Sequence, residues 1–114
     1  MSTLYTRTVN LKDSLTDDEV IDILRFSLEE VVPAIRKVPG IRSVKFYSGA
    51  GALWADLSVL AEMDDASANE RLLVDAEVRK FLGRLYGALD LNTAGQSFRR
   101  EVPPELIKAL SGRQ

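Results

Sequence analysis

Hydrophobic and polar positions follow one another along the chain in a pattern that predicts strands and amphipathic helices. Residues 4–11 are rich in β-branched and aromatic types, which favour a strand. Thr16 and Glu19 have the spacing of a capping box, in which each side chain accepts a hydrogen bond from the other residue's backbone amide. From Val20 to Val32, apolar residues recur at three- and four-residue steps. This spacing predicts a helix that buries one face.

The first predicted helix contains a proline and ends at a glycine. Pro33 has no amide hydrogen and its ring clashes with the preceding turn, so we expect a kink there. Arg36 and Lys37 suit the last turn of the helix, where cations are favoured. Pro39 and Gly40 then predict the end of the helix.

The second half of the chain predicts two strands, one long helix and a last strand. Residues 41–48 and 52–60 are predicted strands joined by the glycine turn 49–51, which makes an antiparallel hairpin. Residues 67–89 are predicted to be helical. The apolar stripe of that helix comprises Leu73, Val74, Val78, Phe81, Leu82, Leu85 and Leu89. A loop at 90–95 and a fourth strand at 96–102 are expected to follow, ending at two prolines.

The order of these elements predicts the fold class. The order β-α-β-β-α-β is that of the ferredoxin-like α+β fold, in which both helices cover one face of an antiparallel sheet. Residues 1–102 are expected to form this single domain, and residues 103–114 a C-terminal tail or short helix. Because the other face of the sheet has no cover, we expect two copies to pair through it as a dimeric α/β barrel.

Strand alternation predicts which side chains lie on the uncovered face, because neighbouring side chains of a strand point to opposite sides. The set predicted to face the helices is Val44, Phe46, Leu53, Ala55, Leu57 and Val59. The set predicted for the open face is Ser43, Lys45, Tyr47, Trp54, Asp56, Ser58 and Leu60, with Ser97 and Arg99 from the fourth strand. The facing of the first strand stays open, since Arg7 interrupts one alternating set and Thr6 with Thr8 interrupts the other.

A tryptophan and a tyrosine on one sheet face indicate that something covers them, because a solvated face seldom carries both. A second sheet placed over Trp54 and Tyr47 would bury the rings and leave a cavity with a few polar groups. Such a cavity is typical of small-molecule sites. We therefore predict that Trp54, Tyr47 and Ser58 bind a small aromatic ligand between two paired sheets.

Two functions fit this predicted face. In an enzyme, Lys45 or Arg99 would stabilise an oxyanion, and Asp56 would orient the substrate or accept a proton. In a non-catalytic binding or assembly module, Trp54 and Tyr47 would fill the interface between two copies, and Lys45 would pair with Asp56 across the strands. Loss of ligand binding in an intact dimer on Trp54→Ala favours the pocket, whereas loss of the dimer favours the interface.

The amino-acid composition excludes several kinds of catalytic and metal site. The chain has no cysteine and no histidine, which excludes disulfides, thiolate nucleophiles, zinc sites built on these residues and serine–histidine triads. No run of carboxylates has the spacing of a calcium loop, so neither a metal nor a cofactor is expected. The 15 basic and 17 acidic residues give a net charge of −2, which opposes nucleic-acid binding.

The expected location is cytoplasmic. No stretch of the sequence approaches the ~20 apolar residues of a membrane span, so no membrane partner is expected. The N-terminal residues are mixed and polar, unlike a signal segment.

Two segments of the chain resemble a known group of proteins. VPGIRSVKFY at 38–47 and LVDAEVRKFL at 73–82 resemble the dimeric α/β-barrel superfamily, and within it the antibiotic biosynthesis monooxygenase-like proteins. The resemblance covers roughly residues 3–102. It implies a homodimer and a cofactor-independent monooxygenase or isomerase that acts on an aromatic or polyketide-like substrate.

The resemblance also implies site residues. In the oxygenase branch a tryptophan and an arginine line the barrel, and Trp54 and Arg99 are the candidates here. The haem-degrading branch carries an asparagine in the first strand, where Thr6 falls, and a histidine on the second helix, which this chain lacks. Haem degradation is therefore not expected.

Overall fold

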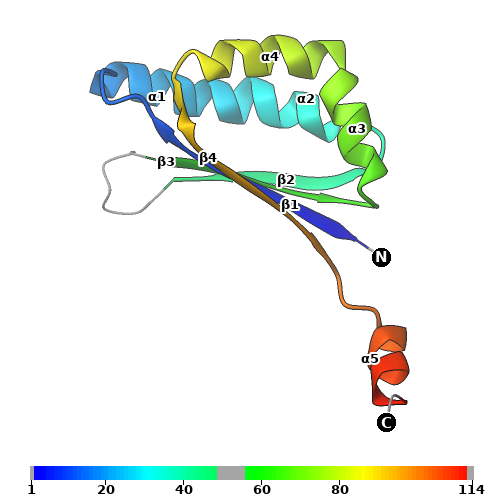
Figure 1. Ribbon diagram of the computed structural model, residues 1–114. Helices are drawn as coiled ribbons and strands as arrows, with labels where there is room; N and C mark the ends of the chain where they lie inside the picture. Colours follow the sequence, from blue (N-terminus) through cyan, green and yellow to red (C-terminus); the bar gives the residue numbers. More distant parts are fainter. Residues whose placement is uncertain (1, 49–55, 113–114) are drawn as a thin grey trace.

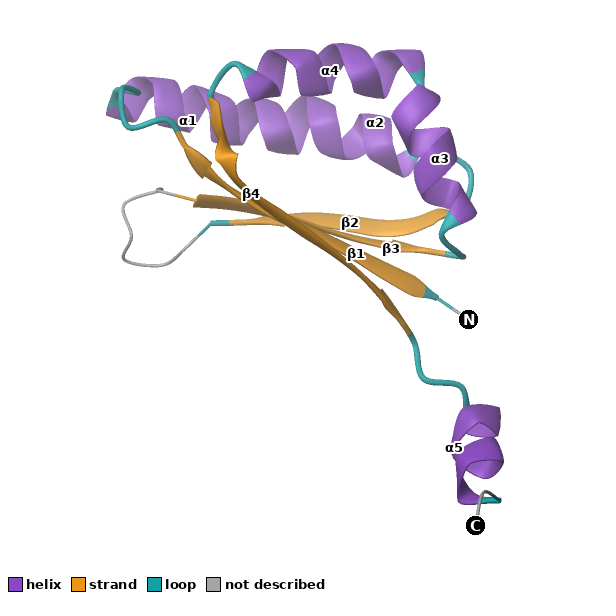
Figure 2. Cartoon of the chain, viewed as in Figure 1, coloured by secondary structure: helices purple, strands orange, loops and turns teal. Residues whose placement is uncertain are grey.

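The structure, a computed structural model, describes residues 2–48 and 56–112 and has two layers, with helices on one face of a sheet (Figures 1 and 2). The four strands of the sheet are β1 (Thr3–Leu11), β2 (Ile41–Tyr47), β3 (Asp56–Met63) and β4 (Leu89–Arg100). Their order across the sheet is β2-β3-β1-β4, and every neighbouring pair is antiparallel. This is the ferredoxin-like α+β arrangement that the order of elements in the sequence predicts.

The first helical segment begins at the predicted capping box. α1 (Asp17–Phe26) follows Thr16, whose hydroxyl accepts from the Glu19 amide while the Glu19 carboxylate accepts from the Thr16 amide. A π-helical turn, η1 (Ser27–Val31), joins α1 to α2 (Val32–Arg36). The Val32 amide bonds to the Ser27 carbonyl, five residues back. The expected distortion at Pro33 therefore takes the form of a wider turn just before the proline.

Gly40 closes this segment in a backbone conformation that favours glycine. Its φ is +93°, and a Cβ at this position would lie 2.9 Å from the Cβ of Ala68. The Gly40 carbonyl accepts from the Asp64 amide at 2.8 Å, which fixes the entry to β2 against the end of β3. The predicted end of the helix at Pro39 and Gly40 is confirmed.

The second helical segment is two helices, so the prediction of one continuous helix was wrong. α3 (Ser67–Val74) and α4 (Ala76–Tyr86) meet at Asp75, whose backbone is extended and whose carboxylate accepts from the Val78 amide at 3.0 Å. Leu73 and Val74 are 59% and 73% exposed, so they do not belong to the buried stripe. Because the apolar spacing continues across the junction at Asp75, periodicity does not reveal that the helix is interrupted there.

β4 begins earlier than predicted and includes all of residues 90–95, so the prediction of a loop there was wrong. Its pairing with β1 shifts register between Thr8 and Asn10. At that point the Asn10 amide donates to the Thr93 hydroxyl at 2.8 Å, and that hydroxyl donates to the Asp90 carbonyl at 2.7 Å. Side chains thus satisfy the backbone groups where the ladder is interrupted.

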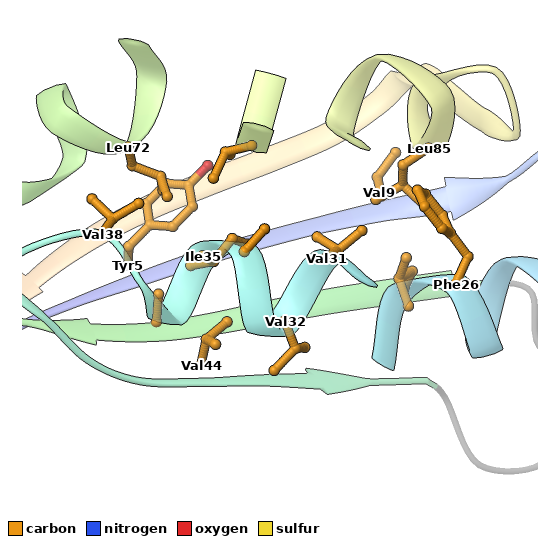
Figure 3. Packing of buried hydrophobic residues seen from close by; sticks show 14 of the residues in the cluster. Tyr5, Val9, Phe26, Val31, Val32, Ile35, Val38, Val44, Leu72 and Leu85 are labelled. Carbon is orange, nitrogen blue, oxygen red and sulfur yellow. The ribbon is translucent and has the colours of Figure 1, made fainter. Parts of the chain in front are cut away.

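The core lies between the helices and one face of the sheet (Figure 3). Leu57, predicted to face the helices, is buried, and Val59 packs against the core. Val44 is also buried, and Phe46 packs against the core. Leu53 and Ala55 of the same predicted set lie outside the described residues.

A last helix, α5 (Pro104–Ser111), lies apart from the two-layer body, on the side of the sheet opposite the other helices (Figure 1). None of its residues is buried. The radius of gyration is 16.6 Å, whereas a compact chain of this length has about 13 Å. Among the helices formed by the described residues, none has the length and apolar character needed to cross a bilayer.

Candidate ligand-binding site

The residues predicted for the open face lie on the side of the sheet away from the helices, wherever the structure describes them. Tyr47 pairs with Ser58, and Lys45 pairs with Leu60. Side chains that are directly opposite in neighbouring strands share a face. Asp56 belongs to the same alternating set of β3 as Ser58. Trp54, the central residue of the prediction, lies outside the described residues.

Arg99 is far from the other predicted catalytic residues within one protomer. It pairs with Leu4 at one end of β1, whereas Asp56 pairs with Asn10 near the other end. Six residues of strand separate those positions, which is about 20 Å. One protomer therefore does not bring Arg99 to Asp56, and the predicted roles of these residues stay predictions.

The opposite side of the sheet encloses a cavity of about 80 Å³ between the strands and the helices. Its floor is the helix-facing side of β1, β2 and β3, and its roof comes from α2, α3 and α4. Figure 3 shows Tyr5 and Val9 of β1 across from Ile35, Leu72 and Leu85 of the helices. Most of the lining side chains are apolar, so the cavity suits a hydrocarbon or aromatic group.

Arg7 is the charged group of this cavity. It comes from the middle of β1, is half-buried, and donates from Nη1 to the Tyr86 hydroxyl at 3.0 Å. Its Cζ also lies 5.3 Å from the centroid of the Tyr86 ring. No carboxylate in the described ranges 2–48 and 56–112 forms an ion pair with Arg7. A guanidinium beside apolar walls, hydrogen-bonded to a neutral phenol, can still bind an anionic oxygen.

Tyr5 supplies a second polar group two residues away on the same face of β1. Its side chain is buried, its hydroxyl donates to Gln96 Oε1 at 3.2 Å, and its ring lies 4.9 Å from that of Phe98. Burial raises the pKa of the Tyr5 phenol above its ordinary value, and the nearby Arg7 charge offsets part of that rise. Tyr5 therefore stays protonated at neutral pH and remains a hydrogen-bond donor.

The cavity approaches solvent at α3. Asn69 and Leu73 line it from this helix, and Leu73 is more than half exposed. Asn69 also offers an amide that can both donate and accept. α3 is therefore a wall of the cavity that carries a half-exposed apolar side chain and a polar one.

The sequence did not predict this site, because strand alternation left open which side chains of β1 face the helices. Tyr5, Arg7 and Val9 form one alternating set, and the charge of Arg7 made that set look no more buried than its neighbour. The local sequence carries no signal for the site, because Tyr86, whose hydroxyl accepts a hydrogen bond from Arg7, lies 79 residues away along the chain. Among the residues that the structure describes, no group of three or more carboxylates could hold a metal ion.

The chain matches no protein-family model and no curated protein sequence. Solved structures share its fold. A dimeric protein of unknown function with a ferredoxin-like fold from Bacteroides fragilis superposes with a TM-score of 0.73 at 14% identity, over 88% of this chain and 96% of that chain. SnoaB, a cofactor-independent oxygenase from Streptomyces nogalater, has a TM-score of 0.67 at 11% identity, over 90% and 97%.

An antibiotic biosynthesis monooxygenase is similar to the same extent, with a TM-score of 0.69 at 14% identity, over 90% of this chain and 100% of that chain. Sequence identities this low establish the fold alone. The predicted ferredoxin-like class is confirmed, and so is the predicted resemblance in fold to the antibiotic biosynthesis monooxygenase-like proteins.

Proposed function

We propose that the protein is a homodimer in which each protomer binds a small, planar, weakly acidic organic molecule between its sheet and its helices. The observation that carries the proposal is Arg7, a half-buried guanidinium beside an apolar cavity with a phenol as its hydrogen-bond partner. The apolar walls accept the ring of the ligand, and Arg7 binds its anionic oxygen. A charge-assisted hydrogen bond of this kind is about twice as strong as a neutral one.

The cavity is smaller in the unbound protein than the proposed ligand requires. At about 80 Å³ it is smaller than the ~300–1,000 Å³ of established small-molecule sites. Ligand entry therefore requires side chains at the open side to move, and exposed Leu73 on α3 is the residue best placed to do so. Asp75 caps α4 independently of α3, so α3 can shift while the rest of the roof stays in place.

The proposed dimer covers the open face of the sheet. Tyr47 is 50% exposed there, with Leu60 and Lys45 beside it. The protein of similar fold from Bacteroides fragilis is described as dimeric. In the dimer, Lys45, Tyr47 and Ser58 lie between the two sheets, as in the assembly alternative that the sequence leaves open.

The finer proposal is cofactor-independent oxygenation of a bound phenol. The phenolate, held by Arg7, is electron-rich and reacts with dioxygen at a ring carbon to give a hydroperoxide. Loss of water then leaves a quinone, so one oxygen atom of dioxygen enters the product and the other leaves as water. The fold shared with a cofactor-independent oxygenase and the apolar walls support this chemistry. A binding protein that carries out no reaction is the alternative.

Para-nitrophenol and its methyl ether test the binding site, because the phenolate absorbs visible light and the ether cannot ionise. We expect the protein to bind para-nitrophenol and to increase its ionised fraction, and to bind the ether at least roughly tenfold more weakly. Arg7→Met should lose the preference for the phenol. Arg79→Met, at an exposed position of α4 outside the cavity, is the matched control and should keep it.

Equal affinity for the phenol and the ether would contradict the proposal, as would unchanged phenol binding by Arg7→Met. Thermal unfolding of both variants checks that the fold is intact. Consumption of dioxygen with a hydroquinone, measured with an oxygen electrode, then separates an oxygenase from a binding protein.

A further inference from the structure

The C-terminal arm, residues 101–112, carries an apolar side that its own protomer does not cover. Leu106, Ile107 and Leu110 of α5 are 41%, 62% and 53% exposed, and Val102 before the helix is 62% exposed. Three of these residues lie within one side of the helix, while Glu105 and Lys108 lie on the other. The arm is thus amphipathic without a visible partner.

An eight-residue helix needs a partner to persist. Isolated helices shorter than about 12–15 residues are marginal in water, because the first turn is costly to form. α5 spans Pro104–Ser111 and has no buried residue. Its helical state therefore depends on packing of its apolar side against another surface.

The connection to β4 restricts where that surface can be. The Glu101 amide donates to the Ser2 carbonyl at 3.0 Å, and this bond is the last backbone contact between the strand and the body before the helix. Residues 101–103 then span at most ~10 Å, and Pro103 stiffens the link. The arm therefore cannot pass around the sheet to the helices of its own protomer.

The arm leaves the body on the open-face side of the sheet (Figure 1). This is the face that the proposed dimer covers, so α5 lies on the side of the sheet where a second copy would lie. We propose that the arm packs against a second copy of this chain, and that a two-fold dimer exchanges two such arms. The inference rests on the dimer of the proposed function but not on the ligand of the cavity.

Isotope-filtered NMR on a mixture of labelled and unlabelled chains tests the exchange directly. We expect nuclear Overhauser effects between the methyl groups of Leu106, Ile107 and Leu110 in one copy and side chains of the other. Contacts found only within one copy would overturn the proposal, because the arm would then cover its own sheet. Random-coil shifts with no contacts would overturn it as well.

A matched pair of variants tests the energetic role of the arm. Ile107→Asp with Leu110→Asp changes the charge by −2 on the apolar side, and Lys108→Asp changes it by −2 on the polar side. Sedimentation equilibrium should show a dimer dissociation constant roughly 10- to 100-fold higher for the double variant. The Lys108→Asp protein should dissociate as the unaltered chain does.

Equal dissociation constants for the two variants would overturn the arm exchange. Para-nitrophenol binding distinguishes this failure from failure of the proposed function. If the double variant remains a dimer and binds the phenol, only the arm exchange is wrong. If the unaltered chain is a monomer that binds the phenol, the dimer and the exchange are both wrong and the cavity site stands.

Discussion

Thr16 and Glu19 show how two side chains determine where a helix begins. Glu19 accepts from the Thr16 amide at 3.1 Å, and its own amide donates to the Thr16 hydroxyl at 3.2 Å. The hydrogen bond from the Thr16 backbone holds the pKa of Glu19 below its ordinary value, because it stabilises the charged carboxylate. The stability that the capping box gives to the start of α1 therefore depends on pH.

The expected consequence is a loss of stability in acid. Because the folded pKa of Glu19 is depressed, its contribution is fully present above the unfolded pKa and declines as the pH falls through the folded pKa. Glu19→Gln keeps a hydrogen-bond acceptor that does not titrate. Urea unfolding of both proteins at neutral pH and below about pH 4 should show that their difference in stability changes with pH. A difference that stays constant across this range would contradict the prediction.

The capping box and the Arg7–Tyr86 contact differ in how far apart their two residues lie along the sequence. The capping box involves residues three apart, so the sequence predicts it. Arg7 and Tyr86 are 79 residues apart, and their contact exists only after β1 and α4 have packed together. Local spacing carries no information about such a pair, which is why the cavity site could not be predicted.

At the scale of elements, Asp75 separates two helices that apolar periodicity joins. It is extended at φ −67° and ψ 124°, and its carboxylate caps α4. Neither glycine nor proline marks the junction, so the sequence offers no strong breaker there. Strand and helix order could be predicted from the sequence, while this junction depends on a side chain whose capping role periodicity does not reveal.

Removal of the cap should destabilise the protein without changing its fold. Asp75→Ala deletes the acceptor of the Val78 amide, and loss of an N-cap costs about 1 kcal/mol of unfolding free energy. Glu70→Ala, at an exposed position of α3, is the control and should change stability by less than about 0.5 kcal/mol. Urea unfolding followed by circular dichroism measures both. An unchanged midpoint for Asp75→Ala would contradict a stabilising role of this cap.

At the scale of the whole molecule, the sheet separates two surfaces with different chemistry. One face encloses the cavity with Arg7, and the other carries Tyr47 and Leu60 toward the proposed partner. The order of elements predicts this division, because both helices of the fold must cover the same face. It does not predict how large a space remains between sheet and helices, since that depends on how individual side chains pack.

A charge at the centre of the open face should disrupt the dimer. Leu60 lies on β3 between Lys45 and Thr6, so Leu60→Asp would bury a carboxylate between the two sheets. We expect the dimer dissociation constant to rise at least roughly tenfold, measured by sedimentation equilibrium. Leu28→Asp, 60% exposed on the helix layer, is the matched control and should leave it unchanged. Equal constants for the two variants would contradict a dimer through this face.

The alternation of β3 has an evolutionary consequence. Leu57, Val59 and Ala61 line the cavity, while Ser58 and Leu60 between them belong to the open face. A point mutation at one of these positions alters a single face, so selection can change ligand preference and partner preference separately along the same eight residues. An insertion or deletion within β3 would exchange the two sets. Lineages descended from this chain should therefore vary at Ser58 and Leu60, keep apolar residues at the buried Leu57 and Ala61, and keep the length of the strand constant.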